Sequence, residues 1–221
     1  MSKLPDSQAA SVGLILAGGR STRMHGREKS LISLAGRSLL DRAIARLSPQ
    51  VDCLAINANT EDSAFRAYGF PVVADAIADR AGPLAGILAG LRWVQSHCPN
   101  ATVLTSTAVD TPYFPKNLVS ILSNYASRAE AVVLAASANG IHPVFGLWPI
   151  AIADDLQAFL RSGANPKVRD FAARHDCRMA MFGDILLPNG ERLDPFFNIN
   201  TPGDAARAEV IAKHFDALET A

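Results

Sequence analysis

The chain has 221 residues, nearly half of them apolar, and its 21 lysines and arginines balance 21 aspartates and glutamates. This composition predicts a domain with a substantial core, and it excludes nucleic-acid binding that depends on an overall positive charge. No apolar run approaches the ~20 residues of a membrane span, and the polar segment 1–11 lacks the apolar centre of a secretion signal. We therefore expect a cytoplasmic protein with no membrane or nucleic-acid partner, a frayed tail at 1–11 and one domain at 12–221.

Predicted strands and helices alternate along the chain. Strands are expected at 12–16, 51–56, 71–74, 102–105 and 131–135, with helices between them at 39–47, 61–67, 84–96 and 116–126. Residues 144–148 are predicted to add an antiparallel strand, and the last third to hold helices at 152–161, 167–175 and 205–218 and a strand at 177–182. Alternation of this kind predicts parallel strands, right-handed crossovers and helices on both faces of the sheet. The predicted fold class is α/β, a single domain with a mostly parallel, Rossmann-like sheet.

The cysteines and tryptophans give no sign of a functional site. The three cysteines, Cys53, Cys98 and Cys177, are odd in number and far apart, without metal-binding or disulfide spacing. They are expected to be inert thiols in a reducing compartment. Trp93 and Trp148 are expected in the core rather than as stacking platforms for a ligand.

The first predicted strand runs into two glycines and then into a basic loop. Gly18 and Gly19 can adopt backbone angles closed to other residues, and their amides can approach a phosphate closely. Four cations follow within ten residues, against the single acid Glu28: Arg20, Arg23, Arg27 and Lys29. The pattern predicts a polyphosphate site that is neither a P-loop nor a dinucleotide fingerprint, because the glycine spacings differ. A Gly-Gly turn followed by a solvated basic loop is the alternative.

Polar groups also follow the other predicted parallel strands. They are Asn57 and Asn59, then Asp75 with the Gly-Pro-Leu-Ala-Gly segment 82–86, and Asp110 with Thr111 and Pro112. Because ligands of open parallel sheets bind beyond the carboxyl ends of the strands, these groups are expected to gather at one edge. Each also has a structural alternative, since Asn57 could cap a strand end, and Asp75 and Asp110 could cap turns.

Taken in order, these motifs resemble the MobA-like nucleotidyltransferases that act on molybdopterin, and among them the molybdenum cofactor guanylyltransferases. The resemblance runs from residue 12 to about residue 204 and depends on segments at 16–19, 29, 57–59, 75, 82–86, 110–112, 142–143 and 198–204. In the family the lysine commonly follows an aspartate, whereas in this chain Lys29 follows Glu28. The resemblance implies a fold like that of the nucleotide-diphospho-sugar transferases.

The resemblance also implies an activity, the transfer of GMP from GTP to molybdopterin with release of pyrophosphate. It implies GTP binding by Leu16, Ala17, Gly18, Lys29, Asn57, Asp75 and Asp110, with Asp110 holding magnesium. On chemical grounds the amides of Gly18 and Gly19 would hold phosphate oxygens, while Arg23 and Lys29 would balance the charge developing on pyrophosphate. No general base is required, because a phosphate nucleophile is already ionised.

The remaining candidates have two interpretations each. Asn198 and Asn200 lie on one face of an extended segment, where they could satisfy loop backbone or contact the pterin substrate. His142, before Pro143, is more often structural than catalytic. Three cations could receive a substrate phosphate or form a solvated helix face, and these are Arg161, Lys167 and Arg169.

Guanine specificity depends on the resemblance alone. The related cytidylyltransferases have Leu-Ala-Ala-Gly and Asp-Met-Pro where this chain has Leu-Ala-Gly-Gly and Asp-Thr-Pro. The alternatives are a molybdopterin cytidylyltransferase, a sugar-1-phosphate nucleotidyltransferase and, in a different class, a nucleotide-binding regulatory module without turnover. The presence of Lys29 and Asp110 argues against the module. Other proteins of molybdenum cofactor assembly are candidate partners.

Overall fold

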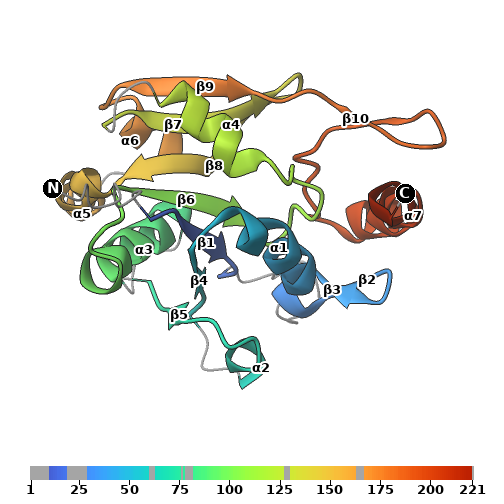
Figure 1. The fold of residues 1–221 in the computed structure, drawn as a ribbon, viewed down its shortest axis with the longest axis horizontal. Helices are drawn as coiled ribbons and strands as arrows, with labels where there is room; N and C mark the ends of the chain where they lie inside the picture. The colour runs from blue at the N-terminus through green and yellow to red at the C-terminus, as the bar shows by residue number, and fades with distance from the viewer. Residues whose placement is uncertain are drawn as a thin grey trace, which may run out of the picture.

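A seven-stranded sheet forms the centre of the fold (Figure 1). The computed structural model describes residues 10–18, 29–59, 63–75, 77, 82–126, 130–162 and 167–220. In their order across the sheet, the strands are β5 (Val72–Val73), β4 (Cys53–Asn57), β1 (Val12–Leu16), β6 (Val103–Ala108), β8 (Gly140–Pro149), β7 (Val132–Ser137) and β9 (Cys177–Met181). Every strand predicted from the sequence is present, with ends that differ by at most a few residues.

The sheet is mostly parallel, as predicted. β1 pairs in parallel with β4 and β6, β4 with β5, and β7 with β9. β8 is antiparallel to both of its neighbours, β6 and β7, which confirms the antiparallel strand expected at 144–148. It is 10 residues long and lies inside the sheet. Only two residues separate Ser137 from Gly140, and a connection this short joins antiparallel neighbours, so β8 must pair with β7.

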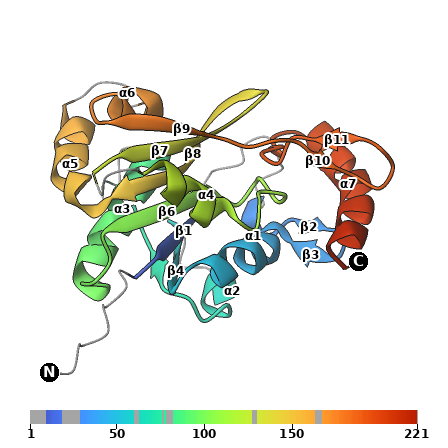
Figure 2. The same ribbon diagram turned by 45° about the horizontal axis from the view of Figure 1, so that its top comes forward.

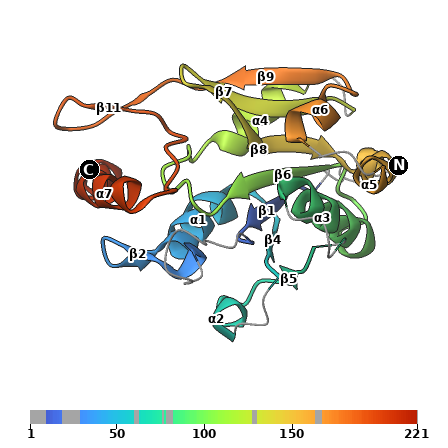
Figure 3. The same ribbon diagram turned by 180° about the vertical axis from the view of Figure 1, so that it is seen from behind.

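Helices cover both faces of the sheet (Figure 1 and Figure 3). One core contains residues of α1 (Leu39–Leu47), α4 (Leu118–Tyr125) and α7 (Pro202–Thr220). The other contains residues of α3 (Pro83–His97), α5 (Ala153–Arg161) and α6 (Val168–Ala172). β1 serves both cores, because Ile15 belongs to the first while Leu14 and Leu16 belong to the second. This alternation is the period of two that a fully buried strand requires.

Two short hairpins were not predicted. β2 (Ser33–Leu34) and β3 (Arg37–Ser38) join through Ala35 and Gly36, both with positive φ, the geometry of a two-residue hairpin turn. β10 (Ile185–Leu186) and β11 (Arg192–Leu193) form the second hairpin, which extends beside α7 (Figure 2). Strands of two residues are too short for an alternating pattern, so periodicity could not find them.

The remaining short elements connect the larger ones. They are the 3-10 turns η1 (Lys29–Leu31), η2 (Ser48–Gln50) and η3 (Ile150–Ile152), and α2 (Ser63–Arg66) within the helix predicted at 61–67. Residues 1–9 of the predicted tail lie outside the described residues, while Ser11 donates to the Asp52 carboxylate from its amide and its hydroxyl. Within the part of the chain that the structure describes, no helix has the length and apolar character needed to cross a bilayer.

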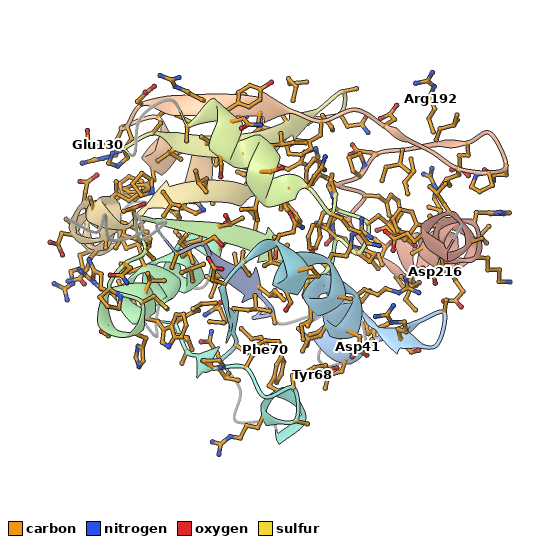
Figure 4. All side chains as sticks on the ribbon, viewed as in Figure 1. Asp41, Tyr68, Phe70, Glu130, Arg192 and Asp216 are labelled. Carbon is orange, nitrogen blue, oxygen red and sulfur yellow. The ribbon has the colours of Figure 1, made fainter. Side chains whose placement is uncertain are left out.

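The C-terminal helix α7 is tied to α1 by two buried arginines. Arg42 donates to both carboxylate oxygens of Asp216 at 2.8 Å and to the carbonyl of Leu34. Arg46 donates to Glu219 at 2.5 Å and lies over the rings of Phe114 and Phe215. Asp216 is on the side of α7 toward α1 (Figure 4). Since α7 directly follows segment 198–201, these contacts also hold that segment against the rest of the fold.

Replacing Asp216 by Asn tests this attachment. The Arg42 guanidinium, through its hydrogen bonds, holds the pKa of Asp216 below its usual range. The ion pair therefore stabilises the fold above the unfolded pKa of about 4 and is lost as the pH falls through the folded pKa. Because Asp216 is 39% exposed, we expect Asp216→Asn to lower the free energy of unfolding by only about 1 kcal/mol at pH 7.

Urea unfolding of both proteins at pH 7 and at pH 3.5 measures the effect. The difference between them is expected to shrink at the lower pH. Asp184→Asn, at an exposed carboxylate, is the matched control and should leave stability unchanged. A difference that is the same at both pH values would contradict the ion-pair assignment.

Candidate functional site

A pocket of about 1040 Å³ opens where the parallel strands end. β1, β4 and β6 run in the same direction, so their last residues meet at one edge of the sheet (Figure 1). The sequence-predicted site residues that line this pocket are Leu16, Ala17, Gly18, Lys29, Asn57, Asp75, Asp110 and Asn198. Gly19 and Arg23, together with Arg20 and Arg27, lie outside the described residues. The structure thus brings together predicted residues that are up to 182 positions apart in the sequence.

Lys29 and Asp110 form an ion pair within the pocket. The Nζ atom of Lys29 lies 2.8 Å from Oδ2 of Asp110, and the two side chains are 13% and 21% exposed. The same Nζ donates to Oδ1 of Asn200 at 3.0 Å. Among the described residues, the Asp110 carboxylate accepts from the side chains of Lys29 and Thr111 rather than from turn amides. The turn-cap alternative for Asp110 is therefore not supported, and its carboxylate faces the pocket.

Asn57 joins the ends of β4 and β5 beneath the pocket. It is 3% exposed, and its amide nitrogen donates to the carbonyl of Val73 at 3.0 Å and to Asp75 at 2.9 Å. Asn59 donates to the other oxygen of Asp75 at 2.7 Å and accepts from the Asp75 amide. Both hydrogens of the Asn57 side-chain amide donate within the protein, so Asn57 does cap the strand ends, as the structural alternative proposed. The ligand-accessible acceptor of this group is the oriented carboxylate of Asp75.

Gly18 departs from its predicted role. Its amide donates to the carbonyl of Asn57 at 3.0 Å, next to the Ala17 amide at 2.9 Å. The Gly18 amide is therefore engaged by the protein in this structure, because it shares the carbonyl of Asn57 with the Ala17 amide just beyond the end of β1. Nor does Gly18 adopt a left-handed backbone angle, and a Cβ there would make only an ordinary contact, 3.7 Å from Oδ1 of Asn57.

The opposite wall of the pocket comes from β8 and from the segment before α7. It contains Ile141, His142, Pro143, Val144, Phe145 and Phe196. The ring of His142 stacks on Phe196 with centroids 4.4 Å apart. Phe196 does not belong to a predicted motif. The antiparallel strand expected at 144–148 and the His142-Pro143 pair were the signals in the sequence that could have located this wall.

A hydrogen-bond network around Ser137 orients His142. The Ser137 hydroxyl donates to Asp194 at 2.8 Å, and it can accept from Nε2 of His142 at 2.8 Å and from the amide of Asn139 at 3.2 Å. One donor and two acceptor sites are the full capacity of a hydroxyl, which assigns the proton to Nε2 of His142. Burial lowers the pKa of His142, against an opposing effect of Asp194. The imidazole is therefore neutral near pH 7 and serves as an oriented part of the pocket wall.

Other candidates lie away from the pocket. Arg161, Lys167 and Arg169 are exposed on α5 and at the start of α6, and none of them lines it. The solvated-face interpretation is therefore the better one for these cations. Trp148 is fully buried and donates to the hydroxyl of Ser106 at 2.8 Å, which confirms it as a core residue.

The cysteines are free thiols, with Cys98 buried and Cys53 and Cys177 half-buried. Burial and the neighbouring Cys53 raise the pKa of Cys98 to about 11, and burial also raises the pKa of Cys177. A raised pKa keeps the unreactive thiol form.

Comparison with known proteins shows similarity over nearly the whole chain. Residues 13–178 match the MobA-like NTP transferase domain. A molybdenum cofactor guanylyltransferase of Rhizobium meliloti (strain 1021) is 44% identical over 219 residues, covering 99% of this chain and 100% of that protein. Its counterpart in Bradyrhizobium sp. (strain ORS 278) is 46% identical over 202 residues, covering 90% and 92%.

A solved structure shares the fold. The crystal structure of molybdopterin-guanine dinucleotide biosynthesis protein A from Archaeoglobus fulgidus superimposes with a TM-score of 0.68 at 21% identity. The superposition covers 91% of this chain and 98% of that one. At this level of identity the likeness concerns the architecture of the sheet and its helices.

Gly86, at the start of α3, tests how closely the floor of the pocket is packed. A Cβ at Gly86 would come within 2.3 Å of Oδ1 of Asn57 and 2.7 Å of Cδ2 of Leu16. Gly86→Ala must therefore displace Asn57 from its bond to Asp75. We expect a loss of about 1–3 kcal/mol in the free energy of unfolding, the usual cost of overpacking. Urea unfolding measures it, with Gly183→Ala as the control because a Cβ there meets nothing within 4 Å. Equal stabilities of the two variants would contradict the packing argument.

Proposed function

The chain belongs to the MobA-like NTP transferase family, and on that premise we propose that it transfers GMP from GTP to molybdopterin and releases pyrophosphate. The product would be the guanine dinucleotide form of the molybdenum cofactor. The observation that carries this proposal is the identity of 44% to a molybdenum cofactor guanylyltransferase along its full length. The arrangement of charged groups in the pocket supports the same chemistry.

The size of the pocket suits two substrates. Its volume of about 1040 Å³ lies at the upper end of the range usual for a single small ligand. We assign GTP to the strand ends, where Leu16, Ala17, Gly18 and the Asn57–Asp75 pair lie. The pterin is assigned to the opposite wall, beside Phe196 and Asn198. The neutral, oriented His142 supports this division, because an uncharged planar ring suits a heteroaromatic substrate better than a polyphosphate.

Lys29 is the proposed counter-charge for the triphosphate. The entering phosphate of molybdopterin and the α-phosphate of GTP are both anions, so catalysis depends on alignment and on neutralising their repulsion. Lys29 is the lysine of the described pocket lining, and its ammonium already binds a carboxylate. Arg23, and the amide of Gly19, are proposed to assist it from the basic loop. No residue has to remove a proton from the ionised nucleophile.

Asp110 is the proposed ligand of a divalent cation, and magnesium is the metal that fits best. Within the described ranges, no three His, Cys, Asp or Glu residues lie close enough together to bind a metal ion. Among the described residues, the protein therefore does not supply a complete set of metal ligands. Magnesium commonly binds through one or two carboxylates, with waters and substrate phosphates completing its shell. When bound, it would neutralise triphosphate charge. Asp110 would hold it at the edge of β6, facing the proposed GTP site.

The base preference is the most direct test of the proposed function. With molybdopterin present, we expect pyrophosphate release from GTP to exceed that from CTP, ATP or UTP by roughly tenfold or more, the effect of one or two specific hydrogen bonds. A coupled pyrophosphate assay measures turnover, and competition binding ranks the four nucleotides. Preference for CTP would indicate a cytidylyltransferase, and turnover with a sugar 1-phosphate instead of molybdopterin would indicate a sugar nucleotidyltransferase. GTP binding without pyrophosphate release would indicate a regulatory module.

Asp110→Asn tests the metal ligand. Asparagine keeps the size of the side chain and removes the charge that a hard dication requires. The variant should fold normally but lose transfer by a factor on the order of 10²–10³, as when one preorganised electrostatic contact is removed. Turnover against magnesium concentration measures the effect, with Asp184→Asn as a control for the loss of one negative charge. Superimposable magnesium curves for Asp110→Asn and the parent protein would refute the assignment.

A further inference from the structure

Two side-chain oxygens contact one cation at the pocket, and that cation is the ammonium of Lys29. Oδ2 of Asp110 and Oδ1 of Asn200 lie 2.8 Å and 3.0 Å from the ammonium of Lys29. A carboxylate and an amide oxygen are also the donors that a hard divalent cation prefers. The ammonium of Lys29 therefore lies beside Asp110, where the proposed metal ion would have to bind.

Contacts that do not involve Lys29 set the backbone positions of Asp110 and Asn200. The amide of Ile199 donates to the carbonyl of Asp110 at 2.9 Å, which joins the two segments. Asp204 then accepts from the amides of Asn200 at 2.9 Å and Thr201 at 2.8 Å, while its own amide donates to the Thr201 hydroxyl. This reciprocal capping of α7 holds Asn200 in place. Removing Lys29 should therefore leave the backbone that carries the two oxygens in place.

The ammonium and a divalent cation cannot occupy this position together. Lys29 is only 13% exposed, and at such short range in a partly buried site the repulsion between two cations is weakly screened. Lys29 must leave Asp110 before a metal can bind there. The triphosphate of GTP offers Lys29 a new anionic partner, so nucleotide binding would release Asp110.

We propose that Lys29 excludes free divalent metal from Asp110, so that metal and triphosphate bind as one coupled event, and that Asn200 holds Lys29 in the excluding position. The proposal depends on the metal role of Asp110 in the proposed function. It makes Asn200 a positioning residue for Lys29, a role different from both interpretations that the sequence left open, a loop-backbone contact and a pterin contact. Metal would thus enter the site together with the nucleotide.

Metal binding without nucleotide is the decisive measurement. Free Mn²⁺ can be followed by electron paramagnetic resonance while the nucleotide-free protein is titrated. We expect Lys29→Met, which keeps the length of the side chain and removes its charge, to bind one Mn²⁺ roughly tenfold to a hundredfold more tightly than the parent protein. Lys213→Met, at an exposed lysine of α7, removes the same charge elsewhere and should behave like the parent. If Lys29→Met does not fold, Lys29→Gln serves the same purpose.

Asn200→Ala tests the positioning role. Loss of one of the two bonds that hold Lys29 should raise Mn²⁺ affinity less than Lys29→Met does. In the Lys29→Met background the same substitution should raise it no further, because the two changes act on one interaction. A merely structural Asn200 would not show this dependence on Lys29. A rise of equal size in both backgrounds would therefore refute the positioning role.

The Mn²⁺ titration also separates this proposal from the proposed function. When GTP is present, Lys29→Met should weaken binding of the metal–nucleotide complex, which is the opposite sign to its effect without nucleotide. Unchanged Mn²⁺ affinity in Lys29→Met without nucleotide, or tight Mn²⁺ binding by the parent protein, would overturn the exclusion. A parent protein that binds no GTP would instead overturn the proposed function, and the nucleotide-free titration would still decide the exclusion.

Discussion

The ammonium of Lys29 and the carboxylate of Asp110 lie 2.8 Å apart at the edge where β1 and β6 end. Each group is largely withdrawn from water, so their attraction is screened less than that of a surface ion pair. The pair joins the segment after the basic loop to the end of β6, 81 residues further along the chain. The triphosphate proposed to bind Lys29 and the metal proposed to bind Asp110 both have to compete with this interaction or replace it.

The position of Asp110 depends on the sheet, and the position of its partners depends on helices at the rim. The parallel register of β1 and β6 brings Ala108 beside Leu16, and Asp110 follows two residues later. Segment 198–201 reaches the same place because α7 is anchored on α1 by Arg42 and Arg46. The arginine contacts lie near the C-terminal end of α7, whereas segment 198–201 lies before its N-terminal end. Because α7 is rigid, these contacts still help to position the segment at the site.

The antiparallel strand β8 gives the pocket its second wall. Parallel strands alone would provide one edge lined by β1, β4, β5 and β6, which is enough for a nucleotide. By inserting between β6 and β7, β8 places His142 and Phe145 opposite that edge. The Ser137 network then fixes the ring of His142 without a charge, so the two walls differ in chemistry.

Local sequence patterns determined the helices and strands, because apolar periodicity depends on residues close together in the chain. The alternation of strands and helices then indicated a mostly parallel sheet. Parallel strands end at one edge, which is why Lys29, Asp75 and Asp110 could be predicted to gather there. Local sequence patterns could not determine hydrogen-bond partners. The Gly18 amide had been expected to face phosphate, yet it pairs with Asn57, and Asn200 contacts Lys29. These pairings depend on strand order and on how α7 is attached. Both are set by contacts between segments far apart in the chain, which only the folded packing specifies.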